Sequence, residues 1–171
     1  AEVRNQNSLA AARNADYEIQ FRDRAGKTIA TRRGSTYIYP GETMHIAEVG
    51  IPSAPPVDVA IVFPRVEWVA LDDVGPDLIA GSREYAIEDD EGLRRSVVTA
   101  AITNRTVIAI PNIMISVLIF NQSENLIGVH RTELESLDAD ETRSLRFAWP
   151  GVIAEVVGSI AVEARSPEFL P

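Results

Sequence analysis

Two stretches of this sequence, about a hundred positions apart, are each expected to form a strand that runs into a turn. Tyr17–Asp23 has the period of two that is expected for a strand with one dry and one wet face, and Ile113–Asn121 is its more hydrophobic counterpart. The similarity extends along most of the chain, and its offset changes only within expected loops. The matched positions are Val3 and Ile102, Asn5 and Asn104, Tyr17 and Ile115, Ile19 and Val117, Phe21 and Ile119, Asp23 and Asn121, Ile29 and Ile127, residues 38–43 and 137–142, Val59 and Ile160, Ile61 and Val162, and Trp68 and Phe169. We therefore predict a duplicated unit.

Each predicted copy contains several short strands separated by turn signals. Val57–Phe63 alternates cleanly, and Asp23–Gly26 and Pro40-Gly41 supply turns. No long window has helical periodicity, and Leu9–Arg13 forms one helical turn at most. Because the repeats are longer than those of solenoids, the pattern is typical of β-sandwiches. We predict an all-β chain with a first sandwich over 1–74, a linker over 75–83 and a second sandwich over 84–171.

Strand and turn motifs recur in both copies. The first copy has Ile19–Asp23, Gly26 and Pro40–Glu42, and the second has Val117–Asn121 and Asp138–Thr142. With these motifs the chain resembles the FxLYD-type domains, which are small immunoglobulin-like sandwiches of prokaryotic exported and envelope-anchored proteins. The resemblance implies two tandem immunoglobulin-like (FxLYD-type) β-sandwich domains and an extracytoplasmic location, in a bacterial cell envelope or secreted. It implies no catalytic residue.

The sequence departs from the family's pattern at two positions. Arg22 stands in place of the usual aromatic residue, and Asn121 stands in place of the turn aspartate. Since an asparagine side chain can form the same local turn as an aspartate, the expected fold is unchanged.

Composition argues against several classes of protein. The chain has 16 Lys plus Arg against 25 Asp plus Glu, a net charge of −9, and its basic residues are scattered, so we expect no nucleic-acid partner. There is no cysteine, which excludes disulfides, thiolate metal sites and a cysteine nucleophile. The longest apolar run, Val107–Phe120, is interrupted by Pro111-Asn112 and is too short for a bilayer. We therefore expect membrane attachment only through an anchor that is not present in this chain.

No motif typical of an enzyme is visible in the sequence. It has no Gly-x-Ser-x-Gly elbow and no glycine-rich phosphate loop, and the only histidines, His45 and His130, lack the spacing of a zinc site. We predict a protein that is not an enzyme and has no metal or cofactor. Trp149 is expected in a core with Phe147, and Trp68 is expected to be tucked against a sandwich edge. An aromatic platform for carbohydrate is therefore not predicted.

Acidic residues gather in three expected loops. These are Asp72-Asp73 with Asp77, Glu88–Glu91, and Asp138 with Asp140-Glu141. Carboxylates in flexible loops suit Ca²⁺, but none of the three has EF-hand spacing, and acidic residues are also common in solvated turns. We favour turn chemistry. A ligand-binding module for Ca²⁺ or carbohydrate, using these loops or the interdomain cleft, is the alternative function.

The second copy differs from the first on one face of its central strand. The first copy has Asp16, Glu18, Gln20 and Arg22 on this face, and the second has Met114, Ser116, Leu118 and Phe120. A contiguous apolar strip is usually covered, either by another part of the chain or by a partner. Cover within the chain is the simpler alternative. In the other, Met114, Leu118 and Phe120 form the surface for a protein partner or for self-association. The leading predicted function is an extracytoplasmic structural or protein-interaction module.

Overall fold

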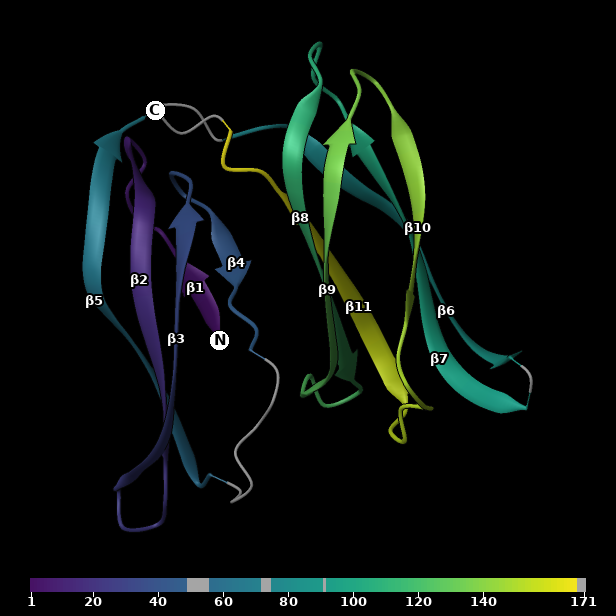
Figure 1. The fold of residues 1–171 in the computed structure, drawn as a ribbon, viewed down its shortest axis with the longest axis horizontal. Helices are drawn as coiled ribbons and strands as arrows, with labels where there is room; N and C mark the ends of the chain where they lie inside the picture. The colour runs from purple at the N-terminus through teal and green to yellow at the C-terminus, as the bar shows by residue number, and fades with distance from the viewer. Residues whose placement is uncertain (49–55, 72–74, 91, 169–171) are drawn as a thin grey trace. The chain divides into compact units, whose positions relative to one another are not determined.

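The computed structural model describes residues 1–48, 56–71, 75–90 and 92–168. These residues confirm the predicted all-β class, and no helix within them is long and apolar enough to cross a bilayer. The strands are β1 (Glu2–Arg4), β2 (Ala10–Arg22), β3 (Thr28–Ile38), β4 (Thr43–His45), β5 (Asp58–Ala70), β6 (Leu78–Asp90), β7 (Leu93–Asn104), β8 (Ile110–Asn121), β9 (Leu126–Leu137), β10 (Thr142–Ala148) and β11 (Val157–Arg165). The described chain divides into two compact units, unit 1 up to Gly75 and unit 2 from Pro76 (Figure 1).

Unit 1 combines a three-stranded antiparallel sheet, in the order β3-β2-β5, with the two-stranded sheet β1-β4 (Figure 1). Apolar side chains from both sheets share one core, in which Tyr17 and Ile19 of β2 pack with Met44 of β4. Gly34 of β3 lies opposite Tyr17 and leaves room for its ring, since a Cβ at position 34 would be 2.4 Å from the tyrosine hydroxyl. The core of unit 1 therefore lies between its two sheets.

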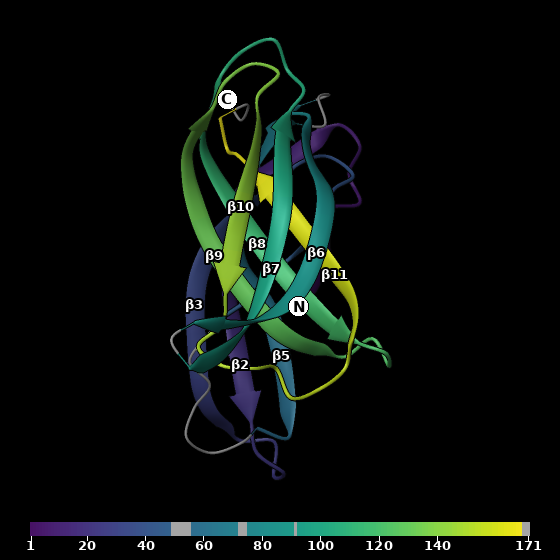
Figure 2. The same cartoon turned by 90° about the vertical axis from the view of Figure 1, so that its right-hand side faces the viewer.

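Unit 2 consists of two three-stranded antiparallel sheets, β10-β7-β6 and β11-β8-β9. The alternate residues Ile113, Ile115, Val117 and Ile119 of β8 are buried in the same core as Phe147 of β10. At one edge of this unit, β6 and β11 lie next to each other (Figure 2). The hydrophobic strand Ile113–Asn121 is thus the central strand of its sheet, with its core face packed on the opposite sheet.

The two units repeat one scheme of strand pairing. Val3 pairs with Met44 in unit 1, and the matched residue Ile102 pairs with Arg143 in unit 2. Ile19 lies opposite Ile61, and the matched residue Val117 lies opposite Val162. The pairing therefore follows the offset that the sequence shows between its two copies.

The turn after the central strand is also repeated. The Asp23 carboxylate accepts the backbone N–H groups of Ala25 and Lys27 at 2.9 Å. The Asn121 side-chain oxygen accepts those of Ser123 and Asn125 at 3.0 and 2.9 Å. Asparagine therefore forms the same local turn as aspartate here.

Two local expectations are wrong. The segment expected to form a helical turn joins β2 from Ala10 onward, because Ala11 and Ala12 are buried in a paired strand. Residues 78–83 of the expected linker form the first half of β6, because Leu78 and Ala80 pack against the unit 2 core. The expected proline-rich loop over 51–56 lies, apart from Pro56, outside the described residues.

Candidate interaction site

A buried asparagine holds the end of β1 and the end of β7 in the same way. The side-chain amides of Asn5 and Asn104 each donate to three backbone carbonyls, at distances from 2.7 to 3.4 Å. The acceptors are Ala10, Ile38 and Tyr39 for Asn5, and Ile108, Leu137 and Asp138 for Asn104. Because these acceptors occupy matched positions, the surroundings of β1 and β7 can be compared residue by residue.

In unit 2, both edges of β7 are paired. β10 occupies one edge and β6 the other, where Leu78–Ala80 lies opposite Ile102–Asn104. Leu78 and Ala80 pack against the core, and the Arg83 guanidinium of β6 donates to the backbone carbonyl of Ile160 in β11 at 3.1 Å. β6 therefore closes the side of unit 2 between β7 and β11.

In unit 1, the matching edge of β1 carries no strand among the residues that the structure describes. The N–H of Asn5 donates to the Glu42 carbonyl at 2.9 Å, and the N–H of Ile46 donates to the Ala1 carbonyl at 2.8 Å. The odd-numbered residues of this segment thus face β4. Because backbone groups alternate between the two sides of a strand, those of Glu2 and Arg4 face the open edge.

An apolar groove of about 300 Å³ lies along this open edge, within unit 1. Its walls are β1 with the following residues Asn5–Asn7 on one side and β5 on the other. Trp68 of β5 borders the groove with 50% of its surface exposed, so the expectation that it is tucked against an edge is wrong. The reason is that its neighbour across the sheet is only Ala12, which is too small to bury the indole.

The floor of the groove explains why unit 1 is hollow here. Ala12 and Ala15 of β2 lie under the groove. The matched residues of β8 are Ile110 and Ile113, which are completely buried in the unit 2 core. Each alanine lacks the methyl and methylene groups that fill the corresponding space in unit 2. Among the described residues, small floor residues therefore occur beside an edge on which no strand is found.

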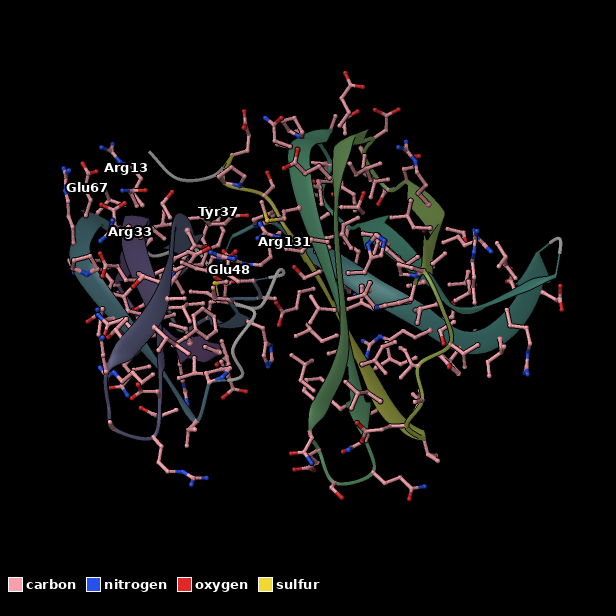
Figure 3. All side chains as sticks on the ribbon, turned by 60° about the horizontal axis from the view of Figure 1, so that its bottom comes forward. Arg13, Arg33, Tyr37, Glu48, Glu67 and Arg131 are labelled. Carbon is pink, nitrogen blue, oxygen red and sulfur yellow. The ribbon has the colours of Figure 1, made fainter. Side chains whose placement is uncertain are left out.

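The residues predicted to form a partner surface lie on β8. Leu118 has only 1% of its surface exposed, and Met114 and Phe120 are partly buried. On the same face, the Arg131 guanidinium of β9 (Figure 3) donates to the Met114 sulfur at 2.6 Å. The three residues share one face, as their alternation predicts, but they do not form an exposed apolar strip.

Two of the acidic residues make turn contacts, and a third, Glu88, forms an ion pair with Arg146 of β10. Glu141 accepts the backbone N–H of Asp138 at 2.8 Å and the guanidinium of Arg143 at 2.6 Å, and these two donors lower the pKa of its carboxyl group. Asp89 accepts the backbone N–H of Gly92 at 2.9 Å. Asp72, Asp73 and Glu91 lie outside the described residues. In the part of the chain that is described, no three acidic or histidine side chains are grouped as metal ligands.

The two histidines have different surroundings. His45 of β4 lies 3.8 Å from the Glu2 carboxylate of β1. His130 of β9 packs edge-on against the rings of Phe147 and Trp149, with centroids 5.5 and 5.6 Å apart. Trp149 packs against the unit 2 core, as predicted. These contacts give His130 a packing role in unit 2.

Sequence reasoning missed the groove, although a signal for it is present. The alignment of the two copies matches Ala12 and Ala15 with Ile110 and Ile113. That difference indicates missing core volume in the first copy.

Comparison with models of known protein families gives no match, and a search of curated proteins gives no significant relative. The function is therefore argued from the geometry of the two units.

Proposed function

We propose that this chain is a non-enzymatic protein-interaction module that acts outside the cytoplasm in a bacterial cell envelope. Its contact surface is the groove of unit 1, and its two units are tandem immunoglobulin-like sandwiches. The groove carries the proposal, because it combines an apolar floor with an exposed tryptophan. The shared core between two sheets in each unit supports the sandwich assignment. The motifs shared with FxLYD-type domains support the location.

The residues around the groove suit binding better than catalysis. Val3, Phe63, Val66 and Trp68 offer apolar surface, and Arg4, Gln6 and Asn7 surround it with polar groups. The amide of Asn5 is already engaged with backbone carbonyls. An apolar centre with a polar rim is the usual anatomy of a protein contact, and tryptophan is among the residues enriched there.

Site-specific photo-crosslinking in the native host tests this function. A benzophenone amino acid replaces Trp68 in the groove, or replaces Glu67 as a matched control. Glu67 is the next residue of β5, and its carboxylate pairs with Arg13 of β2 (Figure 3). Because successive residues of a strand point to opposite faces, only position 68 reaches the groove. We expect protein adducts from position 68 and far fewer from position 67. Equal yields, or no adduct from position 68, contradict the proposal.

The location has its own test. Protease added to intact spheroplasts of the native host is expected to degrade the protein while a cytoplasmic marker survives. Degradation only after lysis contradicts an extracytoplasmic location and leaves the crosslinking result to be judged separately.

A further inference from the structure

We propose that Met114 is a site of reversible oxidation by peroxides, and that Arg131 directs this oxidation to a single epimer of methionine sulfoxide. The inference concerns unit 2 alone and is independent of the proposed function. The chain contains no cysteine and only two methionines, Met44 and Met114. Oxidation of sulfur in this protein therefore takes place at these two residues.

The two methionines have different surroundings. Met44 of β4 is 4% exposed and belongs to the core of unit 1, where its sulfur accepts the hydroxyl of Thr36 at 3.8 Å. Met114 of β8 is only partly buried, because its side chain points away from the core face that carries Ile113 and Ile115. Since oxidation requires that the oxidant reaches the sulfur, Met114 is expected to react first.

A hollow of about 320 Å³ at the surface of unit 2 gives access to Met114. It is lined by Met114 together with Arg131, Thr132 and Glu133 of β9. Hydrogen peroxide has only two heavy atoms, and a water molecule takes up about 30 Å³ in the liquid, so a peroxide molecule fits into this space. The oxidant therefore reaches Met114 without any opening of the core.

The reaction needs a peroxide as its only co-reactant. A lone pair of the Met114 sulfur attacks one peroxide oxygen, and the O–O bond breaks. The second oxygen leaves as hydroxide, which takes the proton of the sulfur-bound hydroxyl and becomes water. The sulfur loses two electrons, the peroxide gains them, and the product is a sulfoxide that is polar and chiral. A reductase with a dithiol as reductant returns the two electrons and releases the oxygen as water.

Arg131 makes the two sides of the sulfur unequal. Arg131 lies opposite Ser116 and Met114 lies opposite Glu133, so Arg131 is the diagonal neighbour of Met114 across the strand pair. Its guanidinium donates to the Met114 sulfur (Figure 3). A thioether sulfur has two lone pairs, and oxidation at each of them gives a different epimer. Because the guanidinium occupies one lone pair, peroxide attacks the other and one epimer is formed.

Oxidation at Met114 is expected to leave the fold intact. The core of unit 2 is built from the opposite face of β8, so the polar sulfoxide at Met114 stays outside it. A sulfoxide at Met44 would instead be buried among the apolar side chains of the unit 1 core. The accessible sulfur of this chain thus lies where its oxidation is tolerated.

Peroxide treatment of the full chain tests the site. Trypsin cleaves after arginine and separates the two methionines, so mass spectrometry of the peptides follows each of them. We expect Met114 to gain one oxygen atom at least about tenfold faster than Met44. Methionine sulfoxide reductases A and B each reduce one epimer. Applied to the tryptic peptides, one of the two enzymes alone is expected to remove nearly all of the oxygen from Met114.

Two variants of residues that line the hollow test the role of Arg131. Arg131→Ala removes the guanidinium from the sulfur, and we expect it to give both epimers in comparable amounts. Glu133→Ala is the matched control, because it changes the lining of the same hollow and keeps the guanidinium. This control is expected to give the single epimer of the unmodified chain. Circular dichroism shows that each variant is folded before it is oxidised.

Several outcomes overturn the inference. Equal rates of oxidation at Met44 and Met114 overturn the assignment of the site. Both epimers in the unmodified chain, or the same single epimer in Arg131→Ala, overturn the role of Arg131. A circular dichroism spectrum that changes when Met114 alone is oxidised overturns the tolerance of unit 2 to this reaction. Each of these results leaves the crosslinking test of the unit 1 groove unaffected.

Discussion

Units 1 and 2 share their strand pairing, their buried asparagines and their turns, but they differ in how one side of the core is closed. Unit 2 uses β6 to pair the outer edge of β7 and isoleucines to fill the core beneath it. Unit 1 has alanines at the matched positions and a groove beside β1. The comparison teaches that one repeated strand scheme holds cores of different volume, because the residue size at two matched positions decides whether the space beneath the edge is filled.

The largest expected effect tests what the units have in common. Asn5→Ala and Asn104→Ala each leave three backbone carbonyls without their side-chain donor. We expect each substitution to lower the free energy of unfolding of its own unit by about 3 kcal/mol. Urea unfolding is followed by Trp68 for unit 1 and by Trp149 for unit 2, in single-tryptophan variants. If only one unit is sensitive, the two asparagines do not have equivalent roles.

The second prediction concerns packing that is particular to unit 1. A Cβ at position 34 would be 2.4 Å from the hydroxyl of Tyr17, whereas the same atom at Gly81 meets its nearest neighbour at 3.6 Å. We expect Gly34→Ala to destabilise unit 1 by about 2 kcal/mol, because a buried ring must move. The matched control Gly81→Ala is expected to have little effect. Combining Gly34→Ala with Tyr17→Ile, which copies Ile115 of unit 2, should restore most of the stability.

Failure of that rescue would mean that Gly34 is needed for a reason other than the tyrosine ring. Unfolding followed by Trp68 in the Trp149→Phe background distinguishes the two explanations, because it reports unit 1 alone.

The third prediction tests whether the floor of the groove has spare volume. Ala12→Ile places the residue found at Ile110 into unit 1, and we expect the free energy of unfolding to change by less than about 1 kcal/mol. Ala100→Ile is the matched control, because Ala100 is completely buried in the packed core of unit 2. There the larger side chain is expected to cost about 1 to 3 kcal/mol. Equal costs in the two units contradict a hollow in unit 1.

The sequence predicted the parts of this fold that depend on local patterns. Alternation located the central strand of the first copy, and the match between the copies located that of the second. The match of Asp23 with Asn121 predicted a shared turn that both side chains form. The offset between the copies matches Ile19 with Val117 and Ile61 with Val162, and the structure places these residues in equivalent strand pairs. These features are readable because strand period and turn chemistry involve residues that are close in sequence.

The remaining features depend on contacts between distant segments. Leu78–Ser82 contains a glycine and follows Gly75-Pro76, so it has the composition of a linker, yet pairing with β7 makes it part of a strand. The exposure of Trp68 depends on the size of Ala12 across the sheet, and the cover over Leu118 depends on tertiary packing. Sequence patterns identify which face of a strand is apolar, but they do not determine what lies against that face.

The smallest expected effect is a pH dependence of unit 2 that involves Glu141. The Asp138 N–H and the Arg143 guanidinium lower the pKa of Glu141 from the ordinary value of 4.5. A carboxyl group whose pKa is lower in the folded state stabilises that state above its unfolded pKa, and this contribution is lost as the pH falls through the folded pKa. Unit 2 is therefore expected to lose a small part of its stability below about pH 4.5 through this group.

Glu141→Gln keeps an oxygen that can accept the Asp138 N–H but does not titrate, so it should reduce the acid dependence. The measurement is urea unfolding followed by Trp149 across this pH range. An unchanged slope in the variant would show that the Glu141 contacts do not contribute to folding, and the turn would then be held by backbone bonds such as that from the Glu141 N–H to the Asp138 carbonyl at 3.1 Å.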